Sequence, residues 1–93
     1  MLSEDQLNQV EEFASNFMSW QQIAILLEFD EEGFRELMLD HSSAVYRRYL
    51  KGKTLSAYAI SKSIVKLAKL GSPQAEILVR DDINRQANAE NEL

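Results

Sequence analysis

Helix-breaking residues are rare in this chain, and their rarity constrains the fold more than any other feature. The 93 residues include one proline and three glycines, whereas a fold of many short strands needs frequent turn residues. Between the breakers, apolar residues such as Leu7, Val10, Ala14 and Phe17 recur at helical spacing. With 45% hydrophobic residues, the chain is long enough for one modest core. The sequence therefore predicts an all-α fold.

Polar signals divide residues 1–41 into three helices. Ser3 and Ser19 are each followed three residues later by a glutamine, which is the pattern of a capping box. Asp30 is a third N-cap candidate, and the glutamates after it suit the positive end of a helix dipole. We expect the first helix to end near Phe17 or Met18 and the second around Glu28 or Phe29. Trp20 is interpreted as a core residue.

Residues 42–93 predict two longer helices. The first starts at Ser42 or Ser43 and runs to Leu70, with Gly71 as its C-cap. Ser72 followed by Pro73 restarts a helix at once, so the two should form an antiparallel hairpin. The apolar stripe of the first comprises Tyr46, Tyr49, Leu50, Ala57, Ile60, Ile64, Leu67 and Ala68, and a bend at Gly52–Lys53 stays open. The packing face of the second comprises Ala75, Leu78, Val79, Ile83 and Ala87.

Charge is strongly segregated along the chain. Residues 1–40 hold ten acids and one base, residues 41–71 hold seven bases and no acid, and residues 72–93 hold five acids and two bases. The formal net charge of −5 hides these blocks. Blocks of one sign repel each other and attract the opposite sign, so the pattern carries information about partners.

Six of the basic residues fall on or beside one side of the long predicted helix, and Tyr58 shares that side. They are Arg47, Arg48, Lys51, Lys62, Lys66 and Lys69. A one-sided cationic stripe is typical of a surface that follows a nucleic-acid backbone. Two other interpretations stay open: a solvated face, or a block that pairs with the acidic blocks within one fold or between copies.

Nothing in the sequence assembles catalytic machinery. There is no cysteine and only one histidine, His41, which we interpret as a linker or capping residue. Gly52-Lys53-Thr54 lacks the earlier glycine and the strand of a phosphate loop. Helix capping explains Asp30 and the two glutamates after it without a metal. We therefore expect no enzymatic activity, cofactor or metal.

The start of the chain lacks the features of a signal peptide, and no stretch is long enough for a membrane span. We therefore expect a cytoplasmic location.

Residues 19–38, SWQQIAILLEFDEEGFRELM, resemble a helix-turn-helix unit. In the wider segment 19–85, the order is IAxLL, DEExF, YxxGK and KLAKLGSPQA. This order is similar to the small terminase subunits of tailed bacteriophages and related prophage DNA-packaging proteins. The resemblance implies a helix-turn-helix unit over 1–41 and an oligomerising helical hairpin over 42–93. It also implies a homo-oligomer that binds double-stranded DNA and a large terminase subunit in the bacterial host cell.

Two features depart from the family pattern. Glu28 stands where the turn usually has glycine, so the turn must form without a left-handed glycine. The groove-facing positions would be Glu31, Glu32, Arg35 and Glu36, of which Arg35 alone is basic. Carboxylates at these positions repel phosphates, so Arg35 is the DNA-binding candidate of this helix. The alternatives are a protein-interaction module whose acidic block docks on a basic partner, and a small helix-turn-helix transcription regulator.

Overall fold

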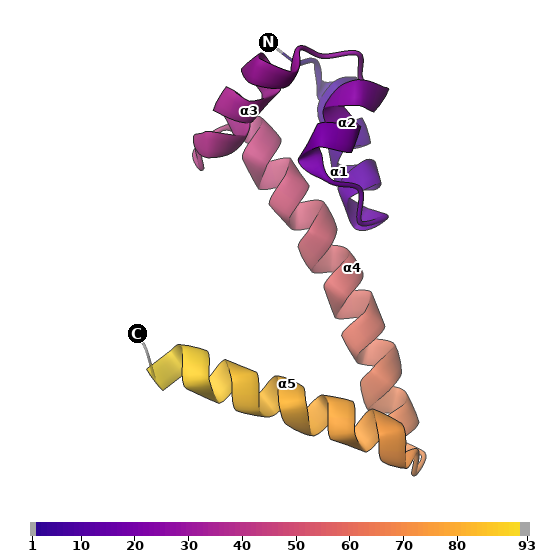
Figure 1. Ribbon diagram of the computed structural model, residues 1–93. Helices are drawn as coiled ribbons and strands as arrows, with labels where there is room; N and C mark the ends of the chain where they lie inside the picture. The colour runs from indigo at the N-terminus through magenta and orange to yellow at the C-terminus, as the bar shows by residue number, and fades with distance from the viewer. Residues whose placement is uncertain (1, 92–93) are drawn as a thin grey trace. The chain divides into compact units, whose positions relative to one another are not determined.

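The computed structural model describes residues 2–91, which form five helices and no strand. They are α1 (Glu4–Ser15), α2 (Trp20–Leu26), α3 (Glu31–Leu39), α4 (Ala44–Lys69) and α5 (Pro73–Asn91) (Figure 1). The all-α prediction is confirmed. By its internal packing the chain divides into an N-terminal unit, which ends at Ala57, and a C-terminal unit, which begins at Tyr58. The first part of α4 therefore belongs with the three short helices.

The predicted N-caps are confirmed at atomic detail. The Ser3 hydroxyl accepts a hydrogen bond from the Gln6 amide at 3.2 Å, and the Gln6 side chain accepts one from the Ser3 amide at 2.9 Å. Ser19 and Gln22 form the same reciprocal box at the start of α2. The Asp30 carboxylate accepts from the Gly33 amide at 3.0 Å. These bonds satisfy amides that the first turn of each helix leaves without a partner.

Left-handed residues end three of the helices. Glu28 has a φ of 53°, and Phe17 and Gly71 have φ values of 62° and 94°. At the end of α2 the Glu28 amide donates to the Ile25 carbonyl at 3.0 Å, and the Phe29 amide donates to the Ala24 carbonyl at 2.9 Å. These two bonds form a Schellman motif.

The left-handed residues correct two predicted boundaries, and α4 ends at Lys69, one residue before the predicted Leu70. α1 ends at Ser15 and α2 ends at Leu26, because Phe17 and Glu28 leave the helical conformation. The prediction that these helices reach the residues at 17–18 and 28–29 was wrong. The turn after α2 does form without glycine, since Glu28 itself adopts the left-handed conformation. Gly71 is the predicted left-handed residue after α4.

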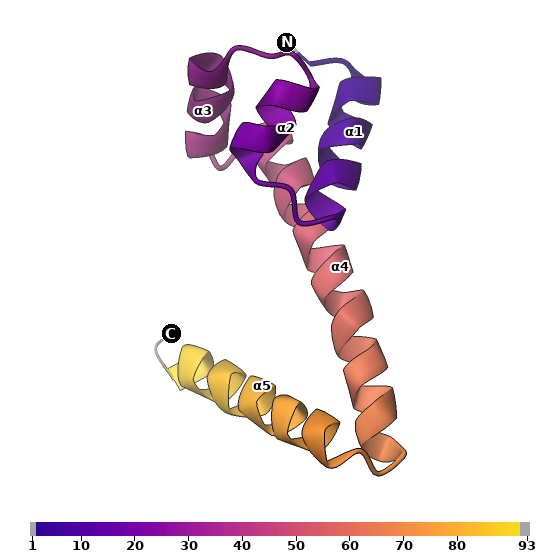
Figure 2. The same cartoon turned by 45° about the vertical axis from the view of Figure 1, so that its right-hand side comes forward.

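All four helical segments of the N-terminal unit contribute to one core. Its buried residues are Val10, Ala14, Ile23, Ala24, Phe34 and Val45. The Trp20 ring stacks on Phe34 with centroids 6.4 Å apart, and Phe29 meets Phe34 edge-on at 5.8 Å. The interpretation of Trp20 as a core residue is confirmed. Figure 2 shows α1, α2 and α3 gathered at the first turns of α4.

Gly52 lies where α4 passes closest to α1. A Cβ atom at this position would stand 2.2 Å from the Glu11 carbonyl oxygen and 3.0 Å from the Ala14 Cβ. Gly52 is buried, and α4 continues through Gly52 and Lys53 without a break. The glycine therefore permits close contact between the two helices. The sequence had left open whether the helix is interrupted at Gly52–Lys53, and it is not.

The C-terminal unit has little buried apolar surface. Of the expected packing face of α5, Ala75 is buried and Val79 is half-buried, whereas Leu78, Ile83 and Ala87 are exposed. The turn before α5 matches expectation, because the Ser72 hydroxyl accepts from the Ala75 amide at 3.3 Å and Pro73 opens the helix. The antiparallel hairpin itself, like the helix-turn-helix arrangement, stays a prediction.

Candidate nucleic-acid interface

The candidate cations of α4 divide between the two units. Arg47, Arg48 and Lys51 belong to the N-terminal unit, and Lys62, Lys66 and Lys69 belong to the C-terminal unit. Arg35 lies on α3 and is exposed. The two groups on α4 differ in whether carboxylates of the same chain lie beside them.

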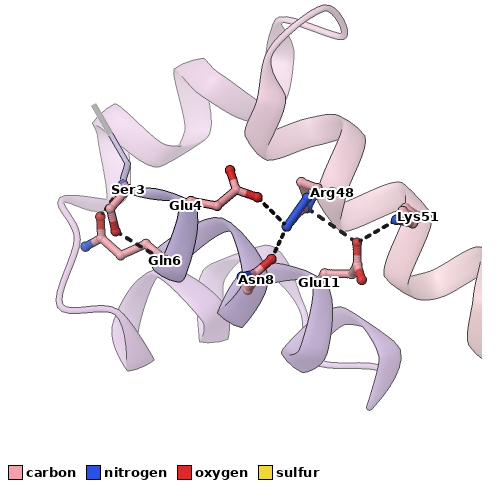
Figure 3. A network of polar contacts seen from close by, with 7 residues as sticks. All are labelled: Ser3, Glu4, Gln6, Asn8, Glu11, Arg48 and Lys51. Atoms are coloured by element: carbon pink, nitrogen blue, oxygen red, sulfur yellow. Dashed lines mark hydrogen bonds and ion pairs between the residues drawn. The ribbon is translucent and has the colours of Figure 1, made fainter.

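Arg48 is the centre of a polar network with α1 (Figure 3). Its Nη2 atom lies 3.2 Å from a Glu4 carboxylate oxygen and donates a hydrogen bond to the Asn8 side chain. Its Nε atom lies 3.4 Å from Glu11 Oε1, and the Lys51 ammonium lies 3.4 Å from the same oxygen. The side chains of Arg48 and Glu11 are only 24% and 27% exposed. Two of the predicted DNA-binding cations are therefore already paired with carboxylates of their own chain.

The network follows from the spacing of α1. Glu4 and Glu11 are seven residues apart, and Asn8 lies between them, so all three side chains share one side of the helix. Gly52 allows α4 to approach this side closely. Reasoning from the sequence did not identify these partners, although the opposite charges of the two segments were a signal that they pair.

Arg47 differs from its two neighbours in the N-terminal unit. It is exposed, and none of the ion pairs found among residues 2–91 involves it. It lines a shallow depression with Leu50, Lys51 and Thr54 of α4. Arg47 is therefore available to an anionic partner, whereas Arg48 is largely occupied.

Three lysines form the lysine face of the C-terminal unit, which we define as Lys62, Lys66 and Lys69. Positions four and three residues apart lie on the same side of a helix. All three side chains are exposed, and none joins an ion pair within the described part of the chain. Together with Tyr58 and Val65 they line one open depression of about 540 Å³. This face combines positive charge with an apolar floor.

The exposed side of α3 is mainly acidic. Glu31, Glu32 and Glu36 are exposed beside Arg35, and no ion pair involving Arg35 occurs in residues 2–91. A surface with three carboxylates for one guanidinium repels phosphates. Of these four positions, Arg35 alone can attract a DNA backbone.

The connection between α3 and α4 is held by local polar contacts. The hydroxyl and the amide of Ser42 donate hydrogen bonds to the Asp40 carboxylate, at 2.6 and 3.0 Å. These bonds, the hydroxyl's first, lower the pKa of Asp40 from its ordinary value because they stabilise the charged form. The His41 ring stacks on Tyr46 with centroids 4.2 Å apart. His41 therefore lies in a packed linker.

Neither a metal site nor a membrane-spanning helix is found within the described range. Residues 2–91 bring no three side chains of histidine, aspartate or glutamate together in a geometry that could hold a metal ion. No helix in this range combines the length and apolar character needed to cross a bilayer. The lysine face is the strongest remaining candidate for a binding site.

Comparisons with known proteins do not place the chain in a family. No family model matches it, and searches of curated proteins and of solved structures gave no significant match.

Proposed function

We propose that the chain is a non-enzymatic, self-associating DNA-binding adaptor, of the kind that the resemblance to small terminase subunits implies. The observation that carries this proposal is the lysine face: three exposed ammonium groups on one side of α4, with no ion pair to another described residue. Arg47 and Arg35 are the further exposed cations that we assign to DNA contacts. A large terminase subunit in the bacterial cytoplasm is the partner that the resemblance adds.

Self-association belongs to the proposal because a single copy offers few contacts. The five assigned cations, each neutralising one phosphate, give a salt slope of at most about −4.5 for log K against log salt concentration, and so only weak binding at physiological salt. Several copies on one DNA molecule increase the affinity without any new type of contact. The exposed apolar residues outside the lysine face, including Leu67 and Ile83, are the surface of the C-terminal unit that we expect other copies to cover.

The paired cations of the N-terminal unit have a lesser role in this proposal. Arg48 and Lys51 share the Glu11 carboxylate, and Arg48 also contacts Glu4. Binding to phosphate through these groups would first require breaking their existing contacts. We therefore assign Arg48 a mainly structural role and place the DNA contacts on the other cations.

Fluorescence anisotropy with labelled duplex DNA at two salt concentrations tests the proposal. We expect binding at low salt that weakens steeply as salt is raised. The triple variant Lys62→Glu, Lys66→Glu and Lys69→Glu should abolish it. Lys66→Glu alone should weaken binding severalfold, whereas the matched charge reversal Arg80→Glu, at an exposed position of α5, should change affinity less than twofold. Unchanged anisotropy of the wild-type chain at low salt with both duplex and single-stranded DNA would refute DNA binding.

A second candidate is a protein-docking module, and the acidic side of α3 is the observation that favours it. Glu31, Glu32 and Glu36 are exposed, and their charge suits a lysine-rich or arginine-rich segment of another protein. The same titration separates the candidates. A chain that binds a basic peptide but not duplex DNA, and loses the peptide on Glu32→Lys, belongs to this second class.

A further inference from the structure

Tyr58 stands out among the three tyrosines of α4 because its ring is uncovered. The ring of Tyr46 stacks on His41, and the Lys53 ammonium lies 4.6 Å from the centroid of the Tyr49 ring. Tyr58 is 64% exposed, and no ring or cation contact to it occurs among residues 2–91. Exposing an aromatic ring of this size leaves a large apolar area in water, so the ring is available to a ligand.

Tyr58 also lies directly beside the lysine face. It precedes Lys62 by one helical turn and lines the same depression as all three lysines, with Val65 and Leu70 completing its wall. A flat ring and three cations thus share one open surface within the C-terminal unit. Proteins that bind single-stranded nucleic acid combine these two elements, since bases stack on aromatic rings while cations hold the backbone.

We propose that this surface prefers single-stranded DNA to duplex DNA, with a base stacked on Tyr58 and phosphates held by Lys62, Lys66 and Lys69. The inference rests on the proposed function and specifies the form of DNA that the site takes. A duplex stacks its bases on one another, so their faces cannot reach the ring, whereas an unpaired strand exposes them. From Tyr58 to Lys69 the helix rises about 16 Å at ~1.5 Å per residue, enough for a short strand on the order of four nucleotides.

The test compares three labelled probes of equal length by anisotropy at low salt. They are oligothymidine, a duplex, and an abasic strand that keeps the phosphates but lacks bases. We expect the wild-type chain to bind oligothymidine most tightly. Tyr58→Ala should weaken oligothymidine binding about tenfold, while affinity for the duplex and for the abasic strand stays within twofold. Tyr58→Phe keeps the ring and should bind oligothymidine within twofold of wild type.

The outcomes separate this inference from the proposed function. If lysine-face variants weaken every probe but Tyr58→Ala weakens none, or weakens all equally, the stacking inference is wrong and DNA binding stands. If the lysine-face variants change nothing, the proposed function is wrong. A Tyr58→Ala variant whose mass in solution falls would show that a second copy covers the ring, which would also overturn the inference. Because Tyr58 is exposed, the helicity of the Tyr58→Ala variant, measured by circular dichroism, should match that of the wild-type chain.

Discussion

Both units of this chain are helical, but they differ in how much of their apolar surface is buried by contacts within the unit. In the N-terminal unit, every helical segment contributes buried apolar residues to one core, which contains Val10, Ala14, Ile23, Ala24, Phe34 and Val45. In the described part of the C-terminal unit, Ala75 is the one buried apolar residue, and Leu67 and Ile83 are 53% and 59% exposed. The first unit is thus stabilised by its own contacts, whereas the second leaves apolar surface that its own chain does not cover.

The charges show the same difference. In the N-terminal unit, Arg48 and Lys51 meet carboxylates of α1. In the C-terminal unit, the lysine face finds no carboxylate within ion-pair distance among the described residues. A cation that is paired within the chain contributes to the fold, and an unpaired cation on an exposed helix is available for binding. The paired cations of the first unit therefore serve mainly its fold, and the unpaired lysine face of the second unit is the main candidate for binding.

The largest expected effect comes from removing the central ring of the N-terminal core. Phe34→Ala deletes a fully buried side chain that contacts Trp20 and Phe29, and should cost about 3–5 kcal/mol. A loss of this size approaches the whole stability of a small domain. Urea unfolding followed by circular dichroism measures it. Ile83→Ala, in the other unit, should change this unfolding transition by less than about 0.5 kcal/mol. Equal losses for both variants would mean that the two units do not differ as described.

Gly52→Ala should give the next largest effect, because the contact of α1 with α4 has no room for a methyl group. The added carbon would meet the Glu11 carbonyl oxygen, which cannot rotate away. We expect a net loss of about 2 kcal/mol, since overpacking outweighs the gain of ~1 kcal/mol in helix propensity. Thermal unfolding of this variant should be compared with that of Thr54→Ala, an exposed change on the same helix. A more stable Gly52→Ala protein would contradict the close approach of the helices.

Glu11→Gln sharpens the comparison of the charges. The substitution removes the carboxylate that Arg48 and Lys51 share, and it should lower stability by about 0.5–1 kcal/mol at low salt, with a smaller loss at high salt. Because it releases Lys51 and removes one negative charge, while Arg48 keeps its contacts with Glu4 and Asn8, duplex binding should become about twofold tighter. Glu12→Gln is the matched control, since the exposed Glu12 joins no ion pair within residues 2–91. Identical salt dependence of unfolding for the two variants would show that the ion pairs of Glu11 do not contribute to stability.

Glu28→Gly should have the smallest effect, and in the stabilising direction. Glu28 adopts a left-handed φ of 53°, which glycine adopts without strain. Relief of that strain stabilises the folded state, and the greater freedom of glycine in the unfolded chain offsets part of this gain. The free energy of unfolding should rise by about 0.5 kcal/mol. Glu28→Ala keeps a side chain in the same conformation and should show no gain in chemical denaturation. A loss of stability on Glu28→Gly would mean that the glutamate side chain makes a contribution that the structure does not reveal.

Local features of the fold were predictable from the sequence, and contacts between helices were not. The caps at Ser3, Ser19, Asp30 and Ser72 depend on neighbouring residues alone, and the structure confirms them. The sequence left the role of Gly52 open, because helix propensity describes an isolated helix, whereas here the glycine permits contact with α1. Left-handed Phe17 and Glu28 were missed because neither residue type favours that conformation.

The candidate site was predictable to a similar extent. Helical periodicity correctly places Lys62, Lys66 and Lys69 on one exposed side with Tyr58. It also grouped them with Arg48 and Lys51, because a pattern on one helix cannot reveal that carboxylates of α1 lie against its first turns. Periodicity thus identified the cations, and tertiary contacts decided which of them remain available.

The mass of the 93-residue chain in solution tests the account most directly. One copy weighs 10.7 kDa. If other copies cover the apolar surface of the C-terminal unit, light scattering coupled to size-exclusion chromatography should give a multiple of this mass, and Leu67→Glu with Ile83→Glu should reduce it towards that of one copy. A wild-type chain that elutes at 10.7 kDa at every concentration would contradict the claim that the second unit is completed by association.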